Sequence, residues 1–155
     1  MPAYNFQRQF VKPILKGNKP HTIRRRRKHP TKVGDELKLY IGMRTKACKL
    51  FAKARCTSIQ PVVIHPWKGE LWMVHPEHDV LCPVEDLGAL ARADGFEDVG
   101  AFFDFFKRYK RECLDDFEII YWDPKELKAY LSLEVLGEGL LGAHPEVVIV
   151  DEVLG

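Results

Sequence analysis

A change in hydrophobic period near residue 83 is the feature that most constrains the fold of this chain. Before Pro83, apolar and polar residues alternate in short runs bounded by proline or glycine, which is typical of half-buried strands. These runs are "HTIRR", "KVGDELKLYIG", "KLFAKARCTSIQPVVIH" and "GELWMVH". After Pro83, apolar residues recur at helical spacing. The sequence therefore predicts an α+β fold in which short strands build a small β-barrel and two or three short helices accompany it.

Three segments carry the helical pattern. The first covers residues 9–16 and is followed by Gly17, a typical residue after a helix C-terminus. The second is expected to begin at Pro83 and to end at Asp94-Gly95. The third is expected to begin near Asp98 and to bury an aromatic stripe, Val99, Phe102, Phe103, Phe106 and Tyr109. Further strands are predicted at 117–122 and in "KAYLSLEVLG".

Length and composition favour one globular domain. The 155 residues are 46% apolar and 30% charged, which is ordinary for a chain that buries a core. No stretch approaches the ~18 apolar residues of a spanning helix, and the N-terminus lacks the apolar region of a signal peptide. We therefore expect a cytoplasmic protein with no membrane partner.

The net charge of +2 conceals an uneven distribution along the chain. Residues 1–56 hold sixteen basic and two acidic residues, a net charge of +14, and the rest holds eight basic and twenty acidic residues, a net charge of −12. Such a division favours a basic surface that faces a polyanion or a phosphorylated ligand. Alternatively, folding interleaves the two halves and leaves no basic patch.

The sequence predicts neither a metal site nor a cofactor. The four cysteines form no CxxC pair and have no histidines at zinc-finger spacing, so reduced thiols are expected. No oligomeric state is predicted from the sequence.

The stretch "GNKPHTIRRRR" spaces its residues as Gly17-x-Lys19-x-x-Thr22-x-Arg24. In a strand that begins at "HTIRR", Thr22 and Arg24 share one face and Ile23 takes the core side. This spacing resembles the ASCH family, the activating signal cointegrator homology domains, whose hallmark is GxKxxTxR after a short helix. The segments "KVGDELKLY", "ADGF" and "FEIIYW" also look like family segments, so the resemblance covers roughly residues 6–123.

The resemblance implies a PUA-like β-barrel with helices beside a cleft that the motif lines. It places the ASCH domain at residues 1–124 and leaves 125–155 as a C-terminal extension, expected to add a strand and a loose tail. Family members are linked to RNA binding, to ribonuclease activity, and to amide hydrolysis of N4-acylated cytidine. The small bacterial enzymes of the last kind use a Lys, a Thr and a Glu, which correspond here to Lys19, Thr22 and Asp94.

The first hypothesis is therefore an amidohydrolase that removes the acyl group from N4-acetylcytidine or related nucleosides, with Gly17 and Arg24 contributing to substrate binding. In one scheme, Lys19 takes the Thr22 proton and Thr22 is the nucleophile, with Asp94 orienting Lys19 or activating the deacylating water. In the other, Asp94 activates water while Lys19 and Thr22 bind the carbonyl oxygen. Asp94 is one methylene shorter than the Glu that the family pattern has.

The second hypothesis is an RNA-binding module or a ribonuclease that uses the same basic cleft. It rests on the basic N-terminal segment and on the continuation of the motif by four cations, Arg25, Arg26, Arg27 and Lys28. Singly, each motif residue also has a structural interpretation, such as a strand former at Thr22 or a helix-end residue at Asp94.

Overall fold

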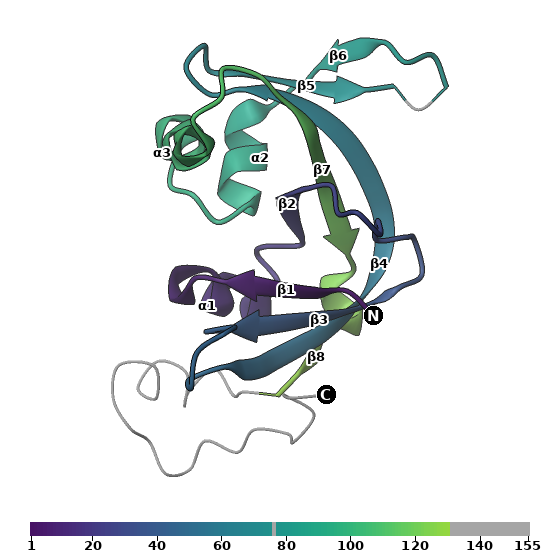
Figure 1. The fold of residues 1–155 in the computed structure, drawn as a ribbon, viewed down its shortest axis with the longest axis vertical. Coiled ribbons are helices and arrows are strands. Elements are labelled where there is room, and N and C mark those ends of the chain that lie inside the picture. The colour runs from purple at the N-terminus through teal and green to yellow at the C-terminus, as the bar shows by residue number, and fades with distance from the viewer. Residues whose placement is uncertain (76, 131–155) are drawn as a thin grey trace. The chain divides into compact units, whose positions relative to one another are not determined.

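A computed structural model describes residues 1–75 and 77–130 of the chain. Within this range the fold is α+β, with three α-helices and eight strands (Figure 1). The elements are β1 (Ala3–Phe6), α1 (Arg8–Lys16), β2 (His21–Arg25), β3 (Glu36–Ile41), β4 (Lys49–His65), β5 (Glu70–Val74), β6 (Leu81–Pro83), α2 (Leu87–Ala93), α3 (Val99–Phe106), β7 (Leu114–Trp122) and β8 (Lys128–Ala129), with short 3₁₀ turns at Lys107–Tyr109 and Pro124–Glu126.

The chain divides into two compact units, each built from separate stretches of sequence. Unit 1 comprises Met1–Pro20, Thr31–Thr57 and the chain from Trp122 onward. Unit 2 comprises His21–Pro30 and Ser58–Tyr121. The predicted extension contributes β8 to unit 1, and the expected loose tail lies outside the described residues.

Unit 1 is a small mixed sheet that packs with α1. β1 runs parallel to β3, and the first part of β4 lies antiparallel between β3 and β8. The helix buries Phe10, Val11 and Ile14, which recur at the spacing of one helical face. Phe6 on β1 meets the Phe51 ring edge to face with centroids 6.0 Å apart, so aromatic contacts add to the apolar core.

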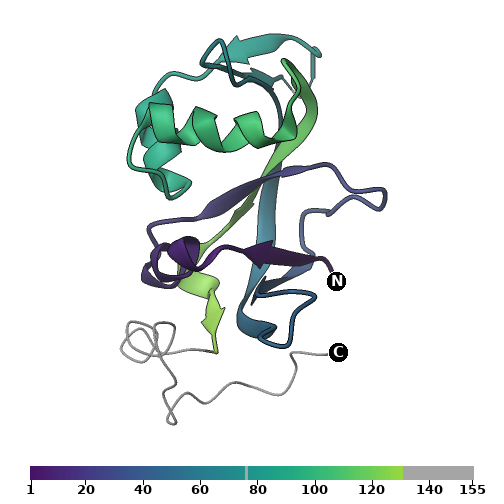
Figure 2. The same ribbon diagram turned by 60° about the vertical axis from the view of Figure 1, so that its left-hand side comes forward.

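Unit 2 has an aromatic core against which α2 and α3 pack. β2 pairs antiparallel with β7, and β5 lies between the second part of β4 and β6. The two helices lie side by side in both ribbon views (Figure 2). Phe102, Phe103 and Phe106 of α3 are buried in one cluster with residues of β2, β4 and β7. The prediction of a core aromatic stripe is thus confirmed for these three residues.

Three details differ from the sequence prediction. The described strands follow the order β1-β3-β4-β5-β6, with β2, β7 and β8 attached beside this path, and no pairing closes them into a barrel. Pro83 ends β6 instead of starting a helix, because Asp86 caps α2 by accepting a hydrogen bond of 2.9 Å from the Ala89 amide. Tyr109 is 38% exposed because α3 ends at Phe106.

Two further predictions concern the chain's last strand and membrane association. Residues 128–129 of the strand expected in "KAYLSLEVLG" form β8, and the portion from residue 131 lies outside the described residues. Across residues 1–75 and 77–130, no helix is both long and apolar enough to cross a membrane.

Candidate active site

Gly17 ends α1 and shapes the loop that carries the start of the motif. Its φ of 84° is left-handed, a conformation that costs little only for glycine. Because the chain turns at Gly17, the Pro13 carbonyl accepts hydrogen bonds from the amides of Asn18 (2.9 Å) and Lys19 (3.1 Å). The glycine that sequence analysis assigned to substrate binding therefore has a conformational role in this loop.

Lys19 is a buried lysine in unit 1, with only 3% of its surface exposed. Its Nζ lies 5.0 Å from the centroid of the Phe10 ring, within the range of a cation–π interaction. Lysine is almost never fully buried unless its charge is compensated, so the burial of Lys19 indicates a specific role for its ammonium group.

Thr22 and Arg24 form a hydrogen-bonded pair on β2. Arg24 Nε donates to Thr22 Oγ1 at 2.9 Å, and Thr22 is 3% exposed. The contact confirms that the two side chains share one face of the strand. Ile23, between them, belongs to the core cluster of unit 2, as the alternating pattern predicted.

Asp94 occupies the C-terminal end of α2 and is 4% exposed. The helix stops because Gly95 adopts a φ of 99° and its amide bonds the Arg92 carbonyl, while the Phe96 amide bonds the Ala91 carbonyl. A carboxylate at a helix C-terminus faces the negative end of the helix dipole. A buried acid in this place requires cationic or hydrogen-bonding neighbours to offset that cost.

His21 is one such neighbour of Asp94, and sequence analysis did not identify it. Its Nε2 lies 3.3 Å from Asp94 Oδ1, and the side chains are 2% and 5% exposed. The available signal was its place inside the motif, between Lys19 and Thr22. The contact brings an imidazole and a carboxylate, two groups that can exchange protons, within salt-bridge distance of each other in unit 2.

Tyr121 is the second residue that sequence analysis missed. It faces His21 across the β2–β7 pairing, with ring centroids 5.2 Å apart. Burial raises the pKa of the Tyr121 hydroxyl, and the negative charge of Asp94 raises it further. The phenol is therefore protonated at neutral pH and available as a hydrogen-bond donor.

The motif residues of unit 2 thus form two pairs. His21 lies at salt-bridge distance from Asp94, and Thr22, the next residue of β2, accepts a hydrogen bond from Arg24. Among the described residues there is no hydrogen bond between Thr22 and Asp94.

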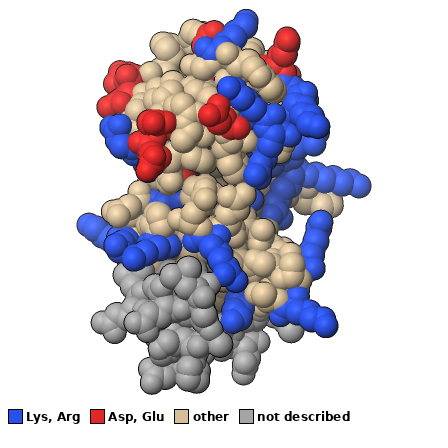
Figure 3. Space-filling model, turned by 90° about the vertical axis from the view of Figure 1, so that its left-hand side faces the viewer, with Lys and Arg blue, Asp and Glu red and all other residues tan. Residues whose placement is uncertain are grey.

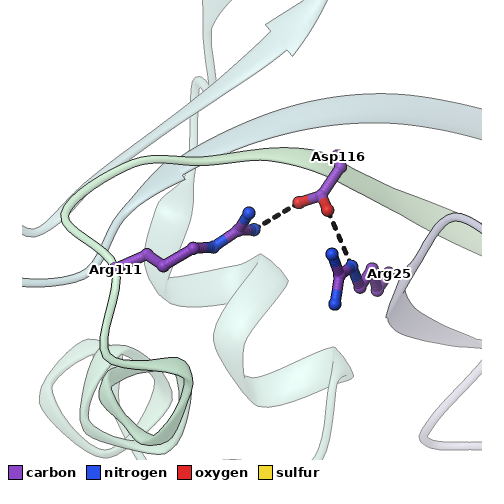
Figure 4. Close-up of polar contacts among 3 residues, drawn as sticks. All are labelled: Arg25, Arg111 and Asp116. Atoms are coloured by element: carbon purple, nitrogen blue, oxygen red, sulfur yellow. Dashed lines mark hydrogen bonds and ion pairs between the residues drawn. The ribbon is translucent and has the colours of Figure 1, made fainter.

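The arginines after the motif face acidic residues of β7. Arg25 Nε bonds Asp116 Oδ2 at 2.8 Å, and Arg111 bonds the other oxygen of that carboxylate (Figure 4). Burial acts to raise the pKa of Asp116, but the hydrogen bonds from Arg111 and Arg25 outweigh it, so the pKa lies below its usual value. The same bond raises the pKa of Arg111.

Arg26 faces a more deeply buried acid. Its Nε lies 3.8 Å from Glu118 Oε2, and the Glu118 side chain is 5% exposed. Burial raises the pKa of Glu118 more strongly than Arg26 lowers it. Two of the four cations assigned to nucleic-acid binding are therefore paired within unit 2.

The other two cations lie near the end of β2. Arg27 is half-buried, and Lys28 is exposed. In the view of Figure 3, the acidic side chains gather on unit 2, which contains α2 and α3, and basic side chains lie on both units. Of the sixteen basic residues among positions 1–56, eleven belong to unit 1 and five, at positions 24–28, belong to unit 2.

The structure of this chain is similar to solved structures of ASCH proteins from Zymomonas mobilis. A crystal structure of ASCH from Zymomonas mobilis matches with a TM-score of 0.45 and 15% identity over 90% of this chain and 92% of that chain. A serine-to-alanine variant of that protein matches with a TM-score of 0.48 and 16% identity over 96% and 84%. A tyrosine-to-phenylalanine variant gives 0.48 and 15% over 96% and 86%. No protein-family model matches the sequence, and no curated protein does.

Proposed function

We propose that the protein is an amidohydrolase that releases the acyl group from N4-acetylcytidine or a related N4-acylated cytosine nucleoside. The proposal rests on the complete GxKxxTxR spacing at Gly17, Lys19, Thr22 and Arg24 and on an acid, Asp94, at the position where the resembled enzymes have Glu. It assigns the catalytic roles to Lys19, Thr22 and Asp94.

The observation that carries the proposal is the burial of polar groups. Six polar or charged residues are buried among the described residues, and four of them are Lys19, His21, Thr22 and Asp94. Buried charges cost stability unless they are compensated, and proteins keep such groups mainly where chemistry needs them. Concentration of these groups in one motif and its acidic counterpart favours a catalytic function over a general basic surface.

In the first scheme, Thr22 Oγ1 attacks the acetyl carbonyl carbon after Lys19 has accepted its proton. The tetrahedral intermediate collapses with cleavage of the C–N4 bond, and protonated Lys19 returns the proton to the departing amine of cytidine. Water then hydrolyses the acetyl ester on Thr22 to acetate. The hydrogen bond from Arg24 Nε to Thr22 Oγ1 supports this scheme, because a cationic donor stabilises the developing alkoxide.

In the second scheme, Asp94 takes a proton from water, which attacks the same carbonyl carbon directly. Lys19 and Thr22 then donate hydrogen bonds to the developing oxyanion. A Thr22→Ala variant separates the two schemes. It abolishes turnover if Thr22 is the nucleophile, and it lowers the rate by about 10²–10³ if Thr22 is one donor to the oxyanion.

The direct test is incubation with N4-acetylcytidine, with release of cytidine followed by chromatography. Wild-type protein and a Lys16→Ala variant should release cytidine, and Lys19→Ala should not. Lys16 is an exposed lysine on α1, only three residues away, and is therefore a matched control. Circular dichroism establishes that each variant is folded. Equal release by Lys19→Ala and wild type would refute the role of Lys19, and no release by wild type would refute the reaction.

A second candidate function is RNA binding, and the exposed Lys28 beside the half-buried Arg27 favours it. The ion pairs of Arg25 with Asp116 and of Arg26 with Glu118 reduce the charge available for phosphates. RNA binding through this run predicts an affinity that falls steeply with salt, with a shallower slope when Arg27 and Lys28 are replaced by Gln. A salt-independent interaction would argue against it.

A further inference from the structure

A second polar site lies in unit 1, on the sheet formed by β3, β4 and β8, which run side by side in Figure 1. Strand register pairs Lys53 of β4 with Lys38 of β3 on one side and with Lys128 of β8 on the other. Residues directly opposite each other in a sheet point to the same face. Three lysines therefore form a row across three strands.

This row is costly in the absence of a ligand. Like charges directly opposite each other destabilise a sheet, and the row contains two such pairs. Arg55 lies two residues beyond Lys53 on the same face of β4 and adds a fourth cation. A face with this charge pattern is stabilised when an anion lies above it.

A pocket of about 350 Å³ opens on this sheet. It is lined by Glu36, Lys53, Ala54, Arg55, Glu126, Lys128 and Tyr130. Its volume falls in the range of small-molecule sites in proteins, which begins at about 300 Å³. The pocket lies wholly within unit 1 and shares no residue with the motif or with Asp94.

Tyr130 provides an independent sign that the pocket is built to bind something. The residue is 7% exposed, and within the described part of the chain its hydroxyl has no hydrogen-bond partner. Such a buried, unsatisfied hydroxyl is uncommon and costs stability. The Nζ atoms of Lys53 and Lys128 lie 5.7 Å and 5.3 Å from the centroid of its ring, so both ammonium groups are next to this tyrosine.

The pocket is lined by three basic and two acidic residues, so its formal net charge is positive. Glu36 Oε1 lies 3.7 Å from Lys53 Nζ, and the Glu36 side chain is 47% exposed. Glu36 lies opposite Arg55 in the β3–β4 register, but in residues 1–75 and 77–130 neither Arg55 nor Lys128 is within salt-bridge distance of a carboxylate. Two unpaired cations and an unsatisfied hydroxyl donor therefore border the same space.

We propose that this pocket binds the phosphate group of a small phosphorylated ligand, a phosphomonoester. Arg55 and Lys128 contact the phosphate oxygens, and the Tyr130 hydroxyl donates the hydrogen bond that it lacks in the unliganded protein. A dianionic phosphate fits several cations and a neutral donor better than a singly charged carboxylate does. The site goes beyond the proposed amide hydrolysis, because N4-acetylcytidine carries no phosphate.

Isothermal titration of the full chain with inorganic phosphate and with cytidine 5′-monophosphate tests the proposal, with cytidine as the phosphate-free probe. Both phosphate compounds should bind saturably at one site in the calorimeter. In a parallel NMR titration, cytidine should leave the amide resonances of Lys128 and Ala129 unshifted. Tighter binding of the nucleotide than of free phosphate would support a nucleotide, and equal binding would support recognition of phosphate alone. Absence of saturable binding by both compounds would overturn the proposal.

Variants locate the binding within the pocket. Tyr130→Phe removes only the hydroxyl and should weaken phosphate binding about tenfold or more, the effect of a hydrogen bond to a charged group. This variant should unfold at the same temperature as wild type or higher, since it loses an unsatisfied buried group. Lys128→Gln should also weaken binding, and Lys12→Gln, an exposed lysine on α1, should not. Equal affinity of Tyr130→Phe and wild type, or equal weakening by Lys12→Gln and Lys128→Gln, would contradict the assignment.

Discussion

The bridge from Arg25 and Arg111 to Asp116 gives a quantitative prediction for Asp116→Asn. Exposed ion pairs contribute about 0.2–1 kcal/mol each. The Arg25 pair belongs at the low end because that arginine is 66% exposed, and the Arg111 pair belongs at the high end because its side chains are 39% and 31% exposed. Loss of both should lower the free energy of unfolding at pH 7 by about 1 kcal/mol, or the melting temperature by about 2–4 °C.

The pH dependence of this loss follows from the pKa of Asp116. That pKa is lower in the folded than in the unfolded protein, so the stabilisation is present above the unfolded value, near 4, and is lost as the pH falls through the folded value. Urea unfolding of wild type and Asp116→Asn should therefore converge below about pH 4. Asp115→Asn removes the same charge from an exposed neighbour and is the control. Equal destabilisation by the two variants at pH 7 would refute the reasoning, because it would reflect net charge and not the bridge.

Three further substitutions have defined outcomes. Burial raises the pKa of Glu118 in the folded protein, so ionisation of this carboxyl group destabilises the wild type as the pH rises. The side chain of Glu118→Gln cannot ionise, so the stability of this variant relative to wild type should increase between pH 4 and 7 in urea titrations. Gly17→Ala should destabilise by about 1–2 kcal/mol, measured by the same method, because a side chain is strained at a φ of 84°. Phe102→Ala, in a fully buried position, should cost about 3–5 kcal/mol by calorimetry, and the half-buried Phe105→Ala should cost clearly less.

Sequence patterns predicted elements well where local chemistry decides the structure. The end of α1 at Gly17, the cap of α3 at Asp98 and the strand β4 all follow from local signals, namely a left-handed glycine, a side-chain acceptor for the Ala101 amide, and alternating apolar residues. The start of α2 was misplaced because Pro83 is equally compatible with the edge strand β6. Closure into a barrel depends on pairing between distant strands, which no local pattern specifies.

The candidate site was predictable only in part for the same reason. The spacing from Gly17 to Arg24 and the alternation on β2 were readable from the sequence, and the bond from Arg24 to Thr22 agrees with them. The approach of His21 to Asp94 joins residues seventy-three positions apart and depends on where α2 ends. The ion pairs of Arg25 and Arg26 likewise require the register of β2 against β7.

The arrangement of the two units also limits how this chain can be dissected. It passes between them four times, after Pro20, Pro30, Thr57 and Tyr121, and the last two crossings fall inside β4 and β7. No continuous gene fragment therefore encodes either unit, and a single protease cut cannot release one of them intact. Lys19 and Thr22 stand on either side of the first crossing, so a piece of the protein that holds only one unit contains only one of these two motif residues.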